Sequence, residues 1–260
     1  MGRGGSFGTG VPVVVAHRGA SATHPENTMA SFEAAVASGA EVVEFDVRVT
    51  ADGSPVVMHD ALVDRTTDGH GAVRSLSLDE VRRLRVRNSD DPSLGVPTLL
   101  EVLTAVSGRV GVDIEIKNIP GDPDFDADRE RAVEATLEAV EAAAFVGPVL
   151  VSSFNPLSIA RARELEPRIT TGLLTTVGVE ADVALGFADE HGHQWVLPFV
   201  AEVVAAGPGF AERVHRVGMF AGTWIVDDPD AAVALMRSGV DAVATNDPVA
   251  LVAARDRAFG

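Results

Sequence analysis

The chain has 260 residues, of which 46% are apolar, and its formal net charge is −17. That length fits one barrel of about 250 residues without a second domain, and it is long enough to bury a sizeable core. The negative charge excludes nucleic acid and anionic membrane surfaces as partners, and the absence of cysteine excludes disulfides and thiolate metal sites.

The first residues predict a tail followed by one folded domain. Residues 1–10 are rich in glycine and predict a flexible segment, with the folded domain over residues 11–260. The first apolar run, Val11 to Ala16, is too short for a signal-peptide core, and no run approaches the roughly 20 residues of a membrane span. We therefore expect a cytoplasmic protein with no integral membrane segment.

Short apolar runs alternate with helical patterns along the rest of the chain. The runs predict eight strands, at 11–16, 41–48, 110–117, 148–153, 169–174, 194–198, 219–226 and 240–245. Helices are predicted between them, at about 28–38, 98–107, 127–145, 156–165, 179–191, 200–216, 229–238 and 247–257. Eight β-then-α units indicate an α/β fold of the (β/α)₈ TIM-barrel type. An open doubly wound sheet stays as the alternative, because a count of units does not prove closure.

Residues 52–97 interrupt the alternation. They contain a turn at Asp52-Gly53, a short apolar run from Pro55 to Met58 and a loop with several glycines. This pattern predicts a short β-hairpin and an insertion after the second strand. Long insertions on this fold are often functional loops on the C-terminal face of the barrel.

Charged residues occupy alternate positions of the second and third predicted strands. Glu44 and Asp46 share one face of the second strand, and Asp113, Glu115 and Lys117 share one face of the third. An apolar strand rarely carries charge in this way, because a buried unpaired charge is costly. The alternation therefore predicts that these side chains meet at a site.

Three of these carboxylates suit a single Mg²⁺ or Ca²⁺ ion, which prefers hard oxygen ligands: Glu44, Asp46 and Glu115. The alternative is a buried ion-pair network with Arg18, Lys117 and Arg48. Spacing alone does not decide between metal and network. A phosphate substrate would favour the metal, because the charge of the whole chain repels phosphate. Lys117 is the one lysine beside 20 arginines, and the two side chains differ in shape and hydration.

Two histidines lie where they could serve the same site. His17 follows the first strand directly, and His59 ends the run that starts at Pro55. Cleavage of a phosphodiester needs a base and an acid, and a histidine suits either task, each worth typically ~10²–10⁴-fold. A structural role usually explains an isolated histidine, but two beside several charged groups favour catalysis. Trp224, near the end of the seventh strand, is either barrel core or a wall against a ligand's carbon skeleton.

Motifs in order along nearly the whole chain resemble the glycerophosphodiester phosphodiesterase family, in its compact bacterial form. They are H-R-G-A-S at 17–21, P-E-N-T at 25–28, V-E-F-D-V at 43–47, H-D at 59–60, P-T-L at 97–99, E-I-K at 115–117, S-F at 153–154, and T-N at 245–246. A single block is a weak signal, whereas the ordered set is specific. Asn27 or Thr28 can cap the first helix, and we assign Glu26 and its neighbours to the scaffold.

The resemblance implies a TIM barrel that hydrolyses small glycerophosphodiesters to an alcohol and glycerol 3-phosphate. Matching positions imply that His17 and His59 form the general acid/base pair, and that Arg18 and Lys117 contact the phosphate. Trp224 belongs to a C-terminal block and is placed with the substrate. The implied ligands of one divalent cation, Mg²⁺ or Ca²⁺, are Glu44, Asp46 and Glu115.

Two other functions stay open. The first is a lysophospholipase D-like reaction on lysolipids, which a wide apolar groove at the barrel mouth would favour. The second is a barrel that binds phosphate ligands without catalysis. Loss of a histidine or a carboxylate would mark that second case, and the sequence keeps them all.

Overall fold

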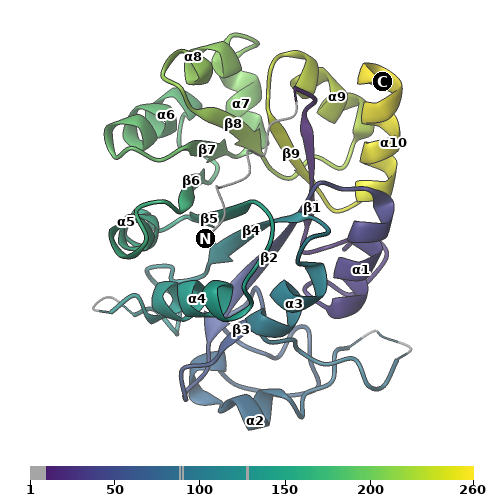
Figure 1. Cartoon of the computed structure of the whole chain (residues 1–260), viewed down its shortest axis with the longest axis vertical. Helices are drawn as coiled ribbons and strands as arrows, with labels where there is room; N and C mark the ends of the chain where they lie inside the picture. The colour runs from purple at the N-terminus through teal and green to yellow at the C-terminus, as the bar shows by residue number, and fades with distance from the viewer. Residues whose placement is uncertain (1–9, 88, 90, 127–128) are drawn as a thin grey trace.

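The computed structural model describes residues 10–87, 89, 91–126 and 129–260 (Figure 1). Most of the tail predicted for residues 1–10 therefore lies outside the described residues. Parallel strands join edge to edge in the order β1-β9-β8-β7-β6-β5-β4-β2, and β1 also pairs with β2. That last pairing closes the sheet into an eight-stranded barrel. The predicted TIM barrel is confirmed, and the open sheet is excluded.

Helices surround the strands, as Figure 1 shows. The barrel strands are β1 (Val13–His17), β2 (Val42–Val49), β4 (Gly111–Ile116), β5 (Val149–Ser153), β6 (Thr170–Thr175), β7 (Trp195–Pro198), β8 (Phe220–Thr223) and β9 (Ala242–Thr245). The helices between them include α1 (Met29–Ser38), α3 (Leu99–Val106), α4 (Arg131–Ala142), α5 (Pro156–Leu165), α6 (Ala181–Glu190), α9 (Pro229–Arg237) and α10 (Pro248–Phe259). No helix in the described part of the chain has the length and apolar character needed to cross a bilayer.

Two predicted boundaries are wrong. The single helix expected over 200–216 is divided into α7 (Val200–Ala206) and α8 (Phe210–Arg216). The break is at Gly-Pro-Gly, where Gly207 has a φ of 79° and Pro208 lacks the N–H that would continue the helix. The strand expected over 219–226 ends at Thr223, and beyond it one isolated bridge joins Trp224 to Phe199.

The segment predicted as a hairpin and insertion packs beside the barrel. Its strand β3 (Pro55–Val57) pairs antiparallel with the end of β2, which confirms the hairpin. A 3₁₀ helix, η1 (Val73–Ser75), and α2 (Leu78–Val81) follow. These elements share a small hydrophobic cluster of their own, made of Val56, Met58, Val63, Val73, Val81 and Val96. In Figure 1 this segment, with β3 and α2, lies at the bottom of the view, next to α3.

Alternation along β2 and β4 divides their side chains between two environments. Val43, Phe45 and Val47 of β2 belong to the large core between the sheet and the helices, as do Ile114 and Ile116 of β4. The charged residues between them face the barrel interior instead. A second apolar cluster fills the barrel interior below them: Val13, Val15, Val42, Leu150, Leu174, Trp195, Leu197 and Ala242. The charged groups are therefore confined to the C-terminal mouth of the barrel.

The turn after β1 brings this mouth against α1 and requires a glycine. Gly19 has a φ of 81°, a left-handed conformation that L side chains rarely adopt. A Cβ atom there would lie 2.4 Å from Ser31 Oγ and 2.6 Å from the Ser31 carbonyl carbon. Both the conformation and the contact therefore exclude a larger residue.

We expect Gly19→Ala to lower the free energy of unfolding more than Gly53→Ala does. Gly53 has a φ of 86° with nothing within 4 Å of a built Cβ, so its replacement costs only the conformational strain of about 1–2 kcal/mol. Overpacking against Ser31 should add about 1–3 kcal/mol at Gly19. Denaturant unfolding of the two variants measures the difference, and equal losses would contradict the steric account.

Candidate active site

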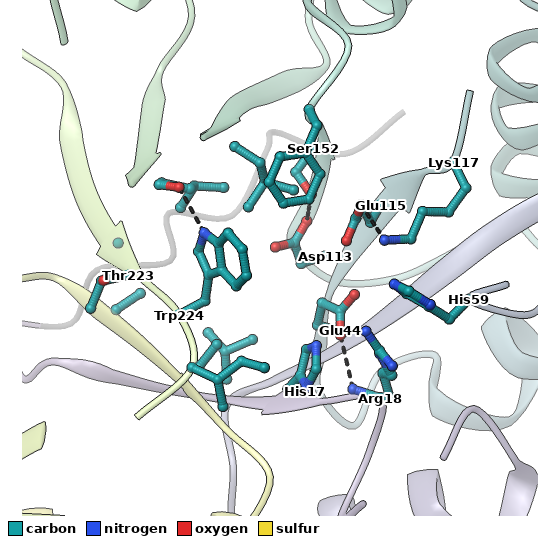
Figure 2. Close-up of a pocket in the computed structure, with 18 residues that line it drawn as sticks. His17, Arg18, Glu44, His59, Asp113, Glu115, Lys117, Ser152, Thr223 and Trp224 are labelled. Atoms are coloured by element: carbon teal, nitrogen blue, oxygen red, sulfur yellow. Dashed lines mark hydrogen bonds and ion pairs between the residues drawn. The ribbon is translucent and has the colours of Figure 1, made fainter. Parts of the chain in front are cut away.

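A cavity of about 190 Å³ opens at the C-terminal mouth of the barrel. Polar groups from β1, β2, β4 and the insertion line one side: His17, Arg18, Glu44, His59, Glu115 and Lys117. Phe154, Leu174, Leu197 and Trp224 line the other. Figure 2 shows the polar side chains directed toward one another, with Trp224 across the cavity. The structure thus brings together seven of the eight predicted site residues, and the eighth, Asp46, is fully buried behind them.

The three predicted metal ligands form one cluster. Asp46 and Glu115 are register partners on β2 and β4. Glu44 lies two residues before Asp46, on the same face of β2. One oxygen from each of the three lies within 4.8 Å of the others. Glu44 Oε1 is buried with no hydrogen-bond partner in the described chain. These residues therefore fit a hard cation, which would complete the coordination of oxygens that the protein leaves incompletely satisfied.

Two cations lie against the same cluster. Lys117 Nζ is 3.0 Å from Asp46 Oδ1 and 2.5 Å from Glu115 Oε1, and Arg18 Nε is 3.2 Å from Asp46 Oδ2. Arg48 does not join them, because its guanidinium pairs with Asp122 and Asp124 instead. The alternative ion-pair network predicted from the sequence is therefore correct for Arg18 and Lys117 and wrong for Arg48. Two positive charges face three carboxylates, which leaves a net charge of −1 if all are ionised.

The surroundings of the three acids shift their pKa values in different directions. Burial, with the nearby carboxylates of Asp46 and Glu115, raises the pKa of Glu44 well above its usual value. Burial also raises the pKa of Glu115 to about 7, although the Lys117 ammonium opposes the shift. Burial acts the same way on Asp46, but Lys117 and Arg18 outweigh it and hold its pKa below the usual range. The cluster therefore lacks the positive charge that would keep every member ionised.

Of the two predicted caps of α1, Thr28 is the cap and Asn27 has another role. Thr28 caps α1 through a capping box with Ser31. Asn27, in a left-handed conformation with a φ of 56°, donates from Nδ2 to Asp46 Oδ2 at 2.7 Å. Asparagine tolerates this backbone conformation better than most residues. Asn27 thus orients a carboxylate of the cluster, and the sequence pattern of a cap before a helix concealed this.

An amide from the end of the chain holds His17. Its Nδ1 lies 2.8 Å from Asn246 Oδ1, and Asn246 Nδ2 donates to Asp227 Oδ2 at 2.8 Å. Because a carboxylate only accepts, this bond fixes the orientation of the amide and turns its oxygen toward His17. Burial, and then the charge of Arg18, lower the pKa of His17 to about 4. His17 is therefore neutral at pH 7, with its proton on Nδ1.

A carboxylate holds His59. Its Nδ1 lies 2.6 Å from Asp60 Oδ1, and Arg65 Nε donates to Asp60 Oδ2 at 2.5 Å. Burial would raise the pKa of Asp60, but hydrogen bonds from Arg65 and His59 outweigh it and lower the value to about 2. Burial also lowers the pKa of His59, although Asp46 and Asp60 oppose the shift. Both ring Nδ1 atoms are thus occupied, and no hydrogen bond within the described residues reaches either Nε2.

Glu26 and Arg65 connect the loop after β1 to the insertion at the mouth of the barrel. Glu26 Oε1 accepts from Arg18 Nη1 at 3.1 Å and from Arg65 Nη2 at 2.7 Å. Arg65 comes from the insertion and Glu26 from the loop after β1. Sequence reasoning assigned Glu26 to the scaffold and gave Arg65 no role. Because Arg65 also contacts Asp60, which holds His59, the Glu26–Arg65 pair links Arg18 to the partner of His59.

Trp224 forms a wall of the cavity. Its indole Nε1 donates to the Leu197 carbonyl at 3.0 Å, and its ring makes edge-to-face contacts with Phe154 and Phe199, each at 5.2 Å between centroids. The ring is half-buried and borders the cavity, so of the two predicted roles the wall agrees with its position. His24 lies outside the cavity lining, where its Nδ1 meets the Thr23 hydroxyl.

Residues 17–250 match the glycerophosphoryl diester phosphodiesterase family. The chain belongs to this family. This phosphodiesterase is 32% identical over 250 residues to a glycerophosphodiester phosphodiesterase of Caldanaerobacter subterraneus subsp. tengcongensis, and the match covers 92% of the chain and 96% of the relative. It is thus an enzyme of the phosphoric diester hydrolase class.

Solved structures agree with the fold of this phosphodiesterase. An Oleispira antarctica phosphodiesterase, determined with the product sn-glycerol-3-phosphate, is similar with a TM-score of 0.84 and 27% identity, over 95% of this chain and 97% of that one. A glycerophosphodiester phosphodiesterase of Agrobacterium tumefaciens is similar with a TM-score of 0.78 and 26% identity, over 93% and 99%. The resemblance stated from sequence motifs is confirmed.

We expect opposite effects on stability from two neutral replacements in the cluster, measured in EDTA at pH 8. Asp46→Asn removes the counter-charge of Lys117 and Arg18 and should lower the free energy of unfolding by about 3–5 kcal/mol. Glu44→Gln keeps an acceptor for the Arg18 N–H and removes repulsion from Asp46 and Glu115, so it should raise that free energy.

The gain from Glu44→Gln should depend on pH. A carboxyl group whose pKa is raised on folding stabilises the fold below its unfolded pKa and loses that contribution as pH rises. The gain should therefore be larger at pH 8 than at pH 5. Denaturant unfolding at the two pH values checks this, and a loss of stability in Glu44→Gln at pH 8 would contradict the electrostatic account.

Proposed function

We propose that the protein hydrolyses glycerophosphodiesters to an alcohol and sn-glycerol 3-phosphate by acid/base catalysis between His17 and His59. The observation that carries this proposal is the arrangement of the two imidazoles. Each is held through Nδ1 by a different side chain, and both border one cavity beside a carboxylate cluster. Family membership supports the reaction, and the product named for the Oleispira antarctica relative supports glycerol 3-phosphate.

The proposed ligands of a divalent cation, Mg²⁺ or Ca²⁺, are Glu44, Asp46 and Glu115. Their clustered oxygens and the unpartnered Glu44 Oε1 support this assignment. When bound, the ion would supply positive charge against the phosphoryl oxygens. Arg18 and Lys117 extend the positive field on the same side of the cavity. They are the protein's own donors for the phosphate, which must enter a molecule with a net charge of −17.

The partners of the two histidines suggest which is base and which is acid. His17 donates its Nδ1 proton to a neutral amide, so its Nε2 carries a lone pair and can take a proton from the attacking hydroxyl. His59 faces the carboxylate of Asp60, which stabilises the imidazolium form. His59 Nε2 then gives its proton to the oxygen of the leaving alcohol. If a glycerol hydroxyl attacks first, water opens the cyclic phosphate with the two roles reversed.

The size of the cavity favours a deacylated substrate over a lysolipid. Its volume of about 190 Å³ is below the roughly 300–1,000 Å³ of pockets that hold drug-sized ligands. A larger groove of about 550 Å³ lies outside His59. Apolar side chains line part of it, including Leu62, Ile119 and Phe154, but charged side chains share the lining, including Asp60, Arg65 and Asp122. An acyl chain would desolvate these groups at a cost. Because the proposed catalytic groups converge in one place, we rank a non-catalytic binding barrel last.

We expect the purified protein to hydrolyse glycerophosphocholine, to lose this activity in excess EDTA, and to regain it with Mg²⁺ or Ca²⁺. A panel with glycerophosphoethanolamine, glycerophosphoinositol and a lysolipid would define the alcohol. Glu44→Gln should remove both the activity and the rise in melting temperature that the ion produces. Glu33→Gln, which changes an exposed carboxylate that pairs with Arg109, should retain both. Full activity in excess EDTA would rule out the metal.

Replacement of either proposed catalytic histidine by alanine should reduce kcat by about 10²–10⁴-fold, because each loses a proton transfer in the transition state. His24→Ala is the matched control and should leave kcat near the wild-type value, since this histidine lies outside the cavity lining and its side-chain hydrogen bond among the described residues is to the Thr23 hydroxyl. Circular dichroism confirms that the variants fold. If both His17→Ala and His59→Ala lost less than about tenfold, the acid/base assignment would be wrong.

A further inference from the structure

A fourth carboxyl group lies in the cavity without a role in the proposed chemistry. Asp113 is 8% exposed and faces the barrel interior from β4, beside its register partner Glu44. Its Oδ1 accepts from Ser152 Oγ at 2.7 Å. No hydrogen bond or ion pair within the described residues reaches its Oδ2. Figure 2 shows Asp113 directed into the cavity, between Ser152 and Trp224.

Asp113 differs from the other buried acids of the site in its surroundings. Lys117 and Arg18 contact Asp46, and Lys117 contacts Glu115, whereas no cation contacts Asp113 in the described part of the chain. The charged groups that act on it most are the carboxylates of Glu115 and Asp46. A carboxyl group in this position costs free energy that an apolar residue would avoid. Packing alone therefore gives no reason for an aspartate here.

Asp113 lies deeper in the barrel than Glu115, at the level of its register partner Glu44. It precedes Glu115 by two residues on the same face of β4, so it lies roughly 7 Å closer to the N-terminal end of the strand. Small or apolar side chains form the opposite surface at this depth, among them Leu197, Ala242 and Ala244. A phosphate at the cluster would therefore direct one of its substituents toward Asp113. Asp113 and Ser152 then supply the polar contacts at the inner end of a largely apolar chamber.

We propose that Asp113, held by Ser152, binds a hydroxyl group of the glycerol half of the substrate and so selects a hydroxylated substituent. This inference rests on the proposed function. A hydroxyl both donates and accepts, so Asp113 Oδ2 can bind it in either protonation state. The glycerol half enters the chamber, with its carbon chain against Trp224. The alcohol half faces the outer groove beyond His59, where the lining does not enclose it.

Calorimetry with two phosphate monoesters in the presence of Mg²⁺ tests this assignment. The probes are sn-glycerol 3-phosphate and n-propyl phosphate, which have the same three-carbon chain but differ in their hydroxyl groups. We expect the wild type to bind glycerol 3-phosphate about 10–100-fold more tightly, the range for a hydrogen bond to a charged or buried partner. Asp113→Leu should bind the two equally, with its affinity for propyl phosphate unchanged. Asp113→Asn, which keeps a donor and an acceptor, should retain most of the discrimination.

The outcomes separate this inference from the proposed function. Equal binding of both probes by the wild type, or full discrimination in Asp113→Leu, would overturn the role of Asp113 and leave hydrolysis intact. Binding of neither probe together with no hydrolysis would overturn both. Propyl phosphate affinity reports directly whether a variant keeps its phosphate site. If Asp113→Leu does not fold, Ser152→Ala releases the same carboxyl group and should reduce the discrimination severalfold, and unchanged discrimination there would contradict the proposal.

Discussion

The buried carboxylate of Asp46 joins three parts of the chain that lie apart in sequence. It receives the ammonium of Lys117 from the end of β4, the guanidinium of Arg18 from the turn after β1, and the amide of Asn27 from the residue before the N-cap of α1. Lys117 also contacts Glu115 and Arg18 also pairs with Glu26, but Asp46 is the carboxylate that both cations contact. The relative positions of β2, β4 and the first loop therefore depend on one ionised side chain. Its low pKa follows from that convergence.

Around Asp46, successive residues of β2 and β4 point alternately outward and inward, which separates the apolar side chains from the charged ones. The outward residues of β2 and β4 complete the core beneath the helices, and the inward residues carry the acids. The result is a site whose carboxylates repel one another in the protein alone. Such an arrangement is costly for folding, and it is the environment in which a bound cation gains the most. Stability and the proposed metal binding therefore oppose each other at Glu44, as is common at catalytic centres.

Sequence reasoning predicted the barrel, the hairpin and the members of the site because these depend on local order. Period-two charge on two strands identified Glu44, Asp46 and Glu115, and strand-end position identified His17 and His59. The support for those residues could not be predicted in the same way. Asn246 is 229 positions from His17, and nothing in a pattern of neighbours indicates that their side chains meet. Asn27 was concealed for another reason, since its place before Thr28 is equally typical of a helix cap. The break between α7 and α8 was missed because apolar periodicity continues across Gly207 and Pro208.

The dependence of His17 on Asn246 has a consequence for how the enzyme matures. A growing chain contains every proposed metal ligand and both imidazoles once residue 117 has been synthesised. The anchor of His17 comes only with the last strand, whose residue Thr245 is the register partner of Ala16 on β1. The pairing of β9 with β1 that closes the barrel therefore also orients His17. A nascent or truncated chain that has gathered the acidic cluster lacks the Asn246 contact of His17 until β9 joins β1. If His17 has the proposed catalytic role, the newly made protein can hydrolyse its substrate only once the barrel is complete.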